Sequence, residues 1–204
     1  MLSRTLALAA TLLIGTSALA ANPVVELETT AGAIRIELYP EAAPKTVANF
    51  LEYVKAKHYD GTQFHRVIDG FMIQGGGYTA DFKPKPTRPP VANEAEMSSK
   101  AGILNVPGTI AMARTSDPNS ATSQFFINVS DNRSLNFRSP EPSGIGYTAF
   151  GKVVSGMDVV NKIAKTPKGK AVPPGVPISP NDLPKDAIVI NKATVVDATA
   201  APAK

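Results

Sequence analysis

The chain has no cysteine, no tryptophan and only two histidines among its 204 residues. Without cysteine it cannot form disulfides or use a thiolate nucleophile, so its stability has to come from core packing. The two histidines, His58 and His65, give little material for a zinc or iron site, and we expect neither a metal nor another cofactor. These absences disfavour metalloenzymes, thiol enzymes and disulfide-rich scaffolds.

The chain also has only a small excess of one sign of charge over the other. The formal net charge is +4, and the 19% of residues that are charged form no dense lysine or arginine block. We therefore expect no nucleic-acid partner. Hydrophobic residues make up 43% of the chain, which is typical of an ordinary globular domain. No internal repeat or linker divides the sequence.

Long hydrophobic runs are missing as well, and the N-terminus comes nearest to one. Arg4 precedes an apolar stretch over residues 6–14, and small residues ending at Ala20 resemble a cleavage site. This order is typical of a secretory signal peptide, and the stretch is shorter than the roughly 20 apolar residues of a membrane span. We expect residues 1–20 to be removed and residues 21–204 to form a single periplasmic or secreted domain without stable membrane insertion. An uncleaved anchor and a buried helix are the alternatives.

Hydrophobic periodicity predicts a β-rich fold with two helices. Short β-like runs separated by polar or glycine-rich turns cover residues 24–28, 33–38, 64–67, 71–74, 109–113, 124–129, 149–154 and 187–196. Such runs favour a closed barrel or a sandwich. Helical spacing covers residues 44–57, beginning at Pro44, and residues 157–163. We expect the first and last strands to meet in the sheet.

Two proline-rich stretches, residues 83–90 and 166–184, show no hydrophobic period. We interpret both as surface loops. The alternative is that they are polyproline ligands for another protein.

The most distinctive segment is FHRVIDGFMIQGG at residues 64–76, followed by AMAR at residues 111–114 and SQFFI at residues 123–127. Other catalytic motifs are weak. No nucleophile-elbow pattern surrounds a serine, which disfavours a triad of Ser130, His65 and an aspartate. The glycines that follow Gln74 do not lead into a helix, so they fit a bulge or sharp turn better than a phosphate-binding loop.

In this order the three motifs resemble those of the cyclophilins. The resemblance covers about residues 24–196. The leader, the short loop from Arg114 to Ser123 and the strand at residues 149–154 are most similar to the bacterial periplasmic members. The resemblance implies a mainly β fold, a closed antiparallel eight-stranded β-barrel with two capping α-helices. It also implies a monomeric peptidyl-prolyl cis-trans isomerase that acts on proline-containing polypeptides without a cofactor.

The resemblance gives Arg66 the central catalytic role. Amide resonance places a barrier of about 18–20 kcal/mol on rotation of a peptide bond, and twisting an X-Pro bond restores a lone pair on the proline nitrogen. A guanidinium aimed at that nitrogen stabilises the twisted state more than the planar state and needs no pH tuning. Taken alone, an arginine between aromatic residues is more often a surface or salt-bridge partner.

The resemblance also supplies the rest of the site. Gln74 would orient Arg66, and Gln124 would help to hold the substrate. The proline slot and its rim would be formed by Phe71, Met72, Ala113, the backbone of Arg114, Phe126, Leu135 and Tyr147. Strand periodicity is expected to place Phe64 on one face with Arg66, Met72 with Gln74, and Phe126 with Gln124. Ordinary core packing is the alternative for the large apolar residues.

Three positions depart from the family pattern. Arg114 stands where many members have asparagine, Ser134 where they have tryptophan, and Tyr147 where they have histidine. Because Ser134 removes a large apolar wall and an indole donor, we expect weak cyclosporin binding. The alternative to an isomerase that assists the folding of exported proteins is a non-catalytic proline-binding chaperone or scaffold module.

Overall fold

The computed structural model describes residues 21–174 and 176–197. The expected signal peptide, residues 1–20, lies outside the described residues. The helices are α1 (Pro44–Lys55), α2 (Ala95–Lys100) and α3 (Met157–Ala164), with a single 3-10 turn, η1 (Arg133–Leu135). The strands are β1 (Val24–Thr29), β2 (Gly32–Leu38), β3 (Thr62–Ile68), β4 (Met72–Thr79), β5 (Thr109–Met112), β6 (Phe125–Asn128), β7 (Ala149–Ser155) and β8 (Val189–Val196).

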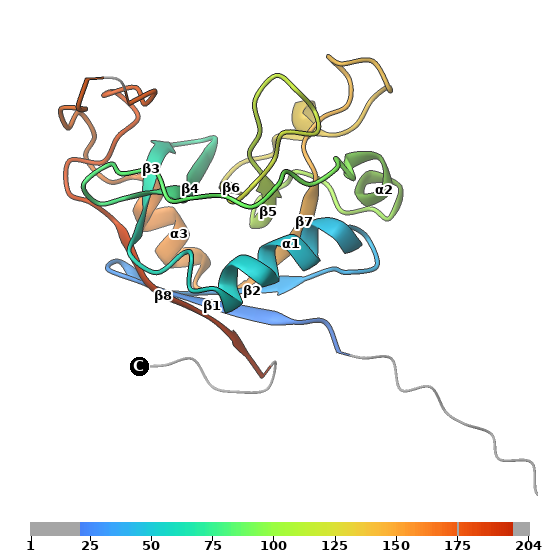
Figure 1. Ribbon diagram of the computed structural model, residues 1–204, viewed down its shortest axis with the longest axis horizontal. Helices are drawn as coiled ribbons and strands as arrows, with labels where there is room; N and C mark the ends of the chain where they lie inside the picture. The colour runs from blue at the N-terminus through green and yellow to red at the C-terminus, as the bar shows by residue number, and fades with distance from the viewer. Residues whose placement is uncertain (1–20, 175, 198–204) are drawn as a thin grey trace, which may run out of the picture.

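The strands close into an antiparallel barrel in the order β1-β2-β7-β5-β6-β4-β3-β8, as can be followed in Figure 1. β1 pairs with β2 on one side and with β8 on the other, so the first and last strands close the barrel. The predicted closed, mainly β barrel is confirmed, and the ends of the domain meet in the sheet as expected.

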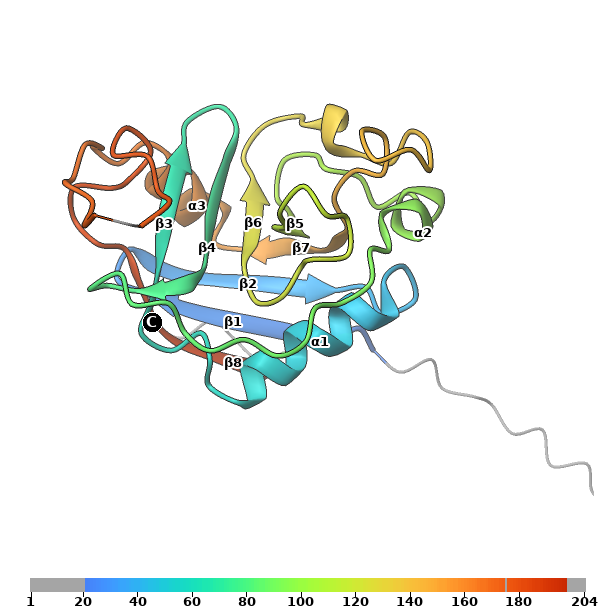
Figure 2. The same ribbon diagram turned by 45° about the horizontal axis from the view of Figure 1, so that its top comes forward.

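Two helices add their apolar faces to the barrel core. α1 begins at Pro44, whose fixed φ and missing N–H suit the first turn of a helix. Figure 2 shows α1 beside β1 and β8, and α3 behind β3 and β4. Their buried residues are Thr46, Val47, Phe50, Tyr53 and Val54 of α1 and Val160, Ile163 and Ala164 of α3. The helical spacing in the sequence therefore predicted both helices.

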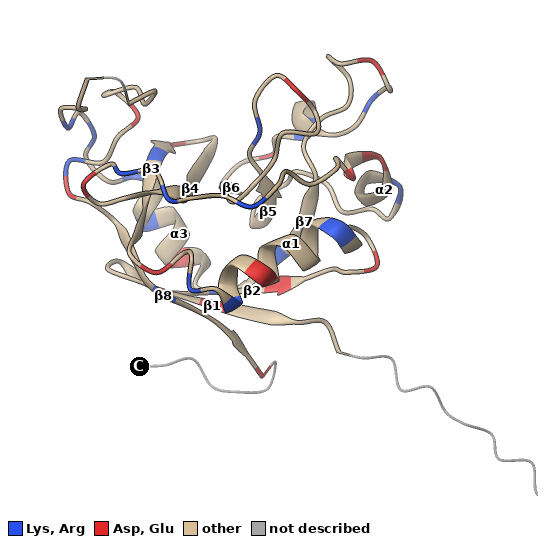
Figure 3. Ribbon diagram, in the orientation of Figure 1, with Lys and Arg blue, Asp and Glu red and all other residues tan. Residues whose placement is uncertain are grey.

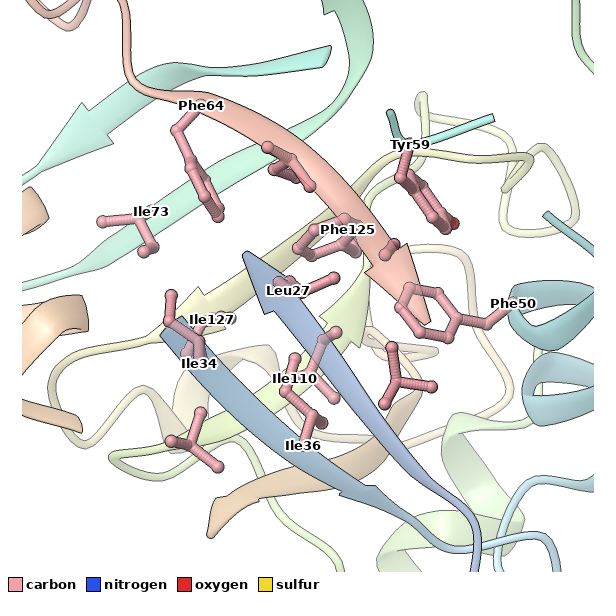
Figure 4. Close-up of a cluster of buried hydrophobic side chains, with 14 of the residues drawn as sticks. Leu27, Ile34, Ile36, Phe50, Tyr59, Phe64, Ile73, Ile110, Phe125 and Ile127 are labelled. Atoms are coloured by element: carbon pink, nitrogen blue, oxygen red, sulfur yellow. The ribbon is translucent and has the colours of Figure 1, made fainter. Parts of the chain in front are cut away.

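Aromatic and aliphatic side chains fill the barrel interior, as Figure 4 shows. Phe125 of β6 is fully buried, and its ring lies edge-on to three other rings. The centroid distances are 5.6 Å to Phe50, 5.4 Å to Tyr59 and 6.1 Å to Phe64. Edge-on packing of this kind adds to the free energy gained by burial, so the core needs no disulfide.

The strands that fill the core also present apolar residues on the outside of the barrel. Ile73 of β4 and Phe125 of β6 belong to the interior cluster. Their neighbours along the chain, Met72 and Phe126, belong to a second cluster with Ala111 and Ala149. This is the period-two alternation of a strand, and it creates a satellite apolar patch on the outer face of β4, β6, β5 and β7.

Three features differ from the elements that the sequence pattern predicts. α2 is too short to show a helical period and buries only Ala95 and Ser98. η1 has three residues and none that is buried. β4 continues through its glycines to Thr79, and the β3–β4 register shifts opposite them. The glycines therefore form a bulge within a strand, as interpreted, but they do not end it.

Charged residues of both signs are distributed around the fold, as Figure 3 shows. Within residues 21–174 and 176–197, each helix is too short or too polar to cross a bilayer. The described residues of the two proline-rich stretches lie outside regular helices and strands, and isolated β-bridges join Tyr78 to Pro84 and Lys168 to Pro184. Both stretches are loops, as predicted.

Candidate active site

Two adjoining cavities open on the outer face of the barrel, over β3, β4 and β6. The smaller, which we call the slot, has a volume of about 120 Å³. The larger, which we call the hollow, has a volume of about 570 Å³. Arg66, Gln74, Ala113 and Arg114 line both cavities. The slot and the hollow are therefore two parts of one continuous site.

Most of the residues that line the slot are apolar, and Met72 and Phe126 of the satellite patch form its floor. Met72 and Phe126 are 2% and 4% exposed. β4 and β6 are paired in a register that sets Gln74 opposite Phe126, which holds these residues side by side. The predicted substrate-binding residues that the structure brings together in the slot are Phe71, Met72, Ala113, Arg114, Phe126, Leu135 and Tyr147.

The segment 132–147 covers one side of the slot, and its hydrogen bonds fix its position. Asn132 donates to the Phe71 carbonyl at 2.8 Å, and the Tyr147 amide donates to the Leu135 carbonyl at 2.8 Å. The Tyr147 ring lies edge-on to Phe126 with centroids 5.8 Å apart. Leu135 and Tyr147 are thus both part of the slot wall, where the resemblance places them.

Arg114 contributes its side chain to the wall of the slot. Its Nε and Nη2 donate to the Gly146 carbonyl at 3.1 and 3.0 Å, and its guanidinium carbon lies 4.4 Å from the centre of the Tyr147 ring. A guanidinium over an aromatic face is an attractive cation–π arrangement. Arg114 therefore holds the wall of the slot, a role that a shorter, uncharged asparagine side chain could not fill in the same way.

Arg66 of β3 lies at the boundary between the slot and the hollow. Its side chain is 42% exposed, and its Nε donates to the Asp182 carboxylate at 3.3 Å. Gln74 lies opposite Arg66 in the β3–β4 register, but its amide donates to Gln124 at 3.0 Å. The two glutamines are thus bonded to each other, and the charged partner of Arg66 comes from the loop that contains Asp182.

Most of the residues that line the hollow have polar side chains, and several of them are residues that the sequence did not identify. They are Thr115, Ser120, Thr122, Pro177, Ile178, Ser179 and Asp182. The first three lie on the short loop after β5, and the others lie in the proline-rich stretch 166–184. These residue types are common on any surface, so no local sequence signal distinguished them.

His65 lies beneath the hollow and is neutral. It is 3% exposed, its ring packs edge-on against Tyr78 at 5.0 Å, and its Nδ1 has no hydrogen-bond partner in the described structure. Its pKa is lowered from 6.5 to about 4, mainly because it is buried; hydrogen bonding to Gln63 and Gln124 opposes this shift, and the nearby Arg66 charge adds a smaller part to it. At neutral pH His65 therefore contributes ring packing and no charge.

The chemistry that this site offers is electrostatic. An apolar slot can hold a proline ring, and a permanently charged guanidinium at its edge can donate to a neighbouring atom. Among residues 21–174 and 176–197 there is no group of three or more histidine, aspartate or glutamate side chains placed to hold a metal ion. A reaction that needs only a fixed donor beside a bound ring fits this arrangement best.

The family model that matches the chain is the cyclophilin type peptidyl-prolyl cis-trans isomerase/CLD, over residues 24–195. A peptidyl-prolyl cis-trans isomerase of Streptomyces antibioticus is 51% identical over 172 residues, which cover 84% of this chain and 98% of the relative. Peptidyl-prolyl cis-trans isomerase B of Escherichia coli is 47% identical over 172 residues, with 84% and 99% covered.

Solved structures agree with the sequence relatives. A cyclophilin type peptidyl-prolyl cis-trans isomerase of Cryptosporidium parvum, in the presence of the dipeptide Ala-Pro, is similar with a TM-score of 0.65 and 27% identity. The match covers 85% of this chain and 99% of that one.

Proposed function

This chain belongs to the cyclophilin-type peptidyl-prolyl cis-trans isomerases, and we propose that it acts on exported proteins, with Arg66 stabilising the twisted X-Pro bond. The activity is peptidyl-prolyl cis-trans isomerisation.

Proline binding is assigned to the slot. Its walls of phenylalanine, methionine, leucine and tyrosine exclude water from one face of the ring, which favours binding by burial of apolar area. Gln124 and the rim at Ala113 and Arg114 would hold the peptide before the proline. No covalent step is needed, because rotation only requires that the amide lose its resonance for a moment.

Arg66 is assigned the donor role. As the bond twists, the proline nitrogen becomes pyramidal and gains a lone pair that can accept a hydrogen bond. A donor that interacts only with this state lowers the barrier without tightening ground-state binding. The observation that carries the proposal is the position of the half-exposed Arg66 side chain at the edge of the apolar slot.

The test of this role is Arg66→Ala. We expect kcat/KM on a proline peptide to fall on the order of a hundredfold, or about 3 kcal/mol of transition-state stabilisation. Because the side chain is half exposed, urea unfolding should change little. Near-wild-type turnover in a protease-coupled assay would overturn the assignment. Peptide binding by the wild type without turnover would instead indicate the proline-binding chaperone.

Export is proposed from the leader and from where the domain begins. The family match starts at residue 24, after the small residues that end at Ala20, so removal of residues 1–20 would leave the matched region whole. Fractionation of cells that express the full chain, with N-terminal sequencing of the mature protein, tests this. A protein found in the cytosol with its leader intact would contradict it.

We propose weak cyclosporin binding because Ser134 is exposed in η1, beside the slot wall at Leu135. It offers neither a large apolar surface nor an indole N–H. Titration calorimetry should show affinity well below that of Ser134→Trp, which restores both features. Tight binding by the wild type would refute the prediction. The same sample is expected to sediment as a monomer.

A further inference from the structure

The proline-rich loop, residues 166–184, docks against the strand that carries Arg66. Figures 1 and 2 both show the orange-red chain of this region beside β3. The Val67 amide donates to the Asp182 carbonyl at 2.7 Å, and Leu183 is fully buried. Within the loop, the Gly169 amide donates to the Leu183 carbonyl at 3.0 Å. The end of the loop is therefore fixed by its backbone and by a buried leucine.

This docking carries the Asp182 side chain to the catalytic arginine. Its carboxylate accepts a hydrogen bond from Arg66 Nε at 3.3 Å, and the two side chains are 24% and 42% exposed. The hydrogen bond to Asp182 is made through Nε, and within the described residues the two terminal nitrogens of Arg66 make no side-chain hydrogen bond. The contact therefore restrains the guanidinium at Nε and leaves the two outer nitrogens available to a substrate in the slot.

We propose that Asp182 is a positioning residue for catalysis, which fixes the Arg66 guanidinium against the twisted proline nitrogen. This inference rests on the proposed function of Arg66. A half-exposed arginine has many rotamers, and a donor that is free to move loses much of its effect on the barrier. Asp182 restricts those rotamers from outside the strand pair, while Gln74, which lies opposite Arg66, is bonded to Gln124.

Two other roles for the pair predict different results. If the ion pair has only a structural role, removing it should leave activity unchanged. It should also change stability little, because a partly exposed ion pair contributes little to folding. A carboxylate beside the guanidinium could also weaken its positive potential, in which case removal of Asp182 would raise activity. We expect positioning to outweigh this effect, because arginine stays charged in either case.

The experiment is a double-mutant cycle with Asp182→Ala, Arg66→Ala and the double variant. Turnover of a proline peptide is followed by a protease-coupled assay, and kcat and KM by exchange NMR. For Asp182→Ala we expect kcat to fall about tenfold with KM nearly unchanged, because the donor acts in the transition state. In the Arg66→Ala background the same change should alter kcat less than about twofold.

Asp182→Asn and Asp186→Asn are the matched substitutions. Asp182→Asn keeps the shape and one acceptor oxygen, and should restore part of the loss. Asp186 is exposed and has no ion pair in the described structure, so Asp186→Asn makes the same change of charge four residues further along without affecting kcat.

Hydrogen exchange measured by NMR distinguishes a loss of Arg66 positioning from a release of the loop from β3. Hydrogen exchange of the Arg66 Nε–H should quicken in Asp182→Ala and not in Asp186→Asn. Exchange of the Val67 amide, which is bonded to the loop backbone, should stay slow in both variants.

Each outcome is distinguishable. Unchanged kcat in Asp182→Ala, or a rise in kcat, would overturn the positioning role while Arg66→Ala still loses activity. An equal loss in both backgrounds would also overturn it, because Asp182 would then act without Arg66. Near-wild-type activity in Arg66→Ala would instead overturn the proposed function on which this inference rests.

Discussion

The barrel interior and the slot are built by the same strands, yet they differ in what lies over them. Phe125 and Phe126 are neighbours on β6, and both are almost completely buried. Phe125 is enclosed by the rings of Phe50 in α1, Phe64 in β3 and Tyr59 just before β3. Phe126 packs against Tyr147 beside an open cavity.

This comparison shows that burial alone does not separate a core residue from a site residue here. The interior is covered by strands and helices that are themselves part of the core. The slot is covered by the segment 132–147, which leaves one side open. Stability should therefore depend mainly on the first region and activity on the second.

The largest expected effect comes from shortening each phenylalanine. Phe125→Ala should lower the free energy of unfolding by about 4 kcal/mol, because the cavity cannot collapse among packed rings. Phe126→Ala should cost roughly half of that, since part of its ring already borders a cavity, while kcat/KM falls about tenfold as the slot loses a wall. Urea unfolding and the isomerase assay measure both. Equal losses of stability would break the comparison.

Substitution of two adjacent glycines of β4 should show the same difference, with one substitution lowering mainly stability and the other lowering mainly activity. A Cβ on Gly76, whose φ is +86°, would lie 2.9 Å from the Tyr59 ring and 3.0 Å from the Phe125 ring. Gly76→Ala should therefore destabilise the fold by about 3 kcal/mol, from backbone strain and overpacking.

At Gly77 the added atom would meet the Gln124 side chain at 2.6 Å. Because that side chain is flexible, Gly77→Ala should move it away from Gln74 and lower kcat/KM roughly fivefold, with a stability loss of less than about 1 kcal/mol. Urea midpoints and kinetics on both variants test the pair. A larger stability loss for Gly77→Ala than for Gly76→Ala would reverse the assignment.

Mild acid should weaken the fold before it affects the chemistry. His65 is neutral in the fold because burial lowers its pKa from 6.5 to about 4, so the unfolded chain binds more protons between these values. The stabilisation is present above pH 6.5 and is lost as pH falls towards 4. Between pH 7 and 5 we expect a loss of about 2 kcal/mol from this residue.

Urea unfolding at the two pH values, with His65→Gln as the control, measures this loss. Burial also lowers the pKa of His58, so some pH dependence should remain in the control. The wild-type kcat should stay nearly constant while the protein is folded, because the guanidinium keeps its charge. An identical pH dependence in His65→Gln would contradict the assignment.

Much of this architecture could be predicted because it follows from short-range periodicity. Alternation predicted the β1–β2 hairpin, and helical spacing predicted α1 and α3. The same alternation separates Met72 from Ile73. It was wrong for Phe64 and Arg66, because the β3–β4 register shifts between them and Phe64 points into the core. The family resemblance supplied the roles of the slot residues.

Residues outside regular elements could not be placed in this way. Leu135 and Tyr147 owe their position to hydrogen bonds from distant residues. One example is the Asn105 amide, which donates to the Asn136 side chain at 2.7 Å. Asp182 was missed because it reaches Arg66 across more than half of the chain, and an aspartate in a proline-rich loop carries no signal of its partner.

The pairing of β1 with β8 has a consequence for how the protein is made. The barrel cannot close until its last strand is available, because β8 supplies the second edge of both β1 and β3. Contacts between distant parts of a chain form slowly. A nascent chain whose first strands have already emerged would therefore remain unclosed while the rest is synthesised. If the proposed export takes place during synthesis, the chain would therefore still be unfolded when it enters the membrane channel.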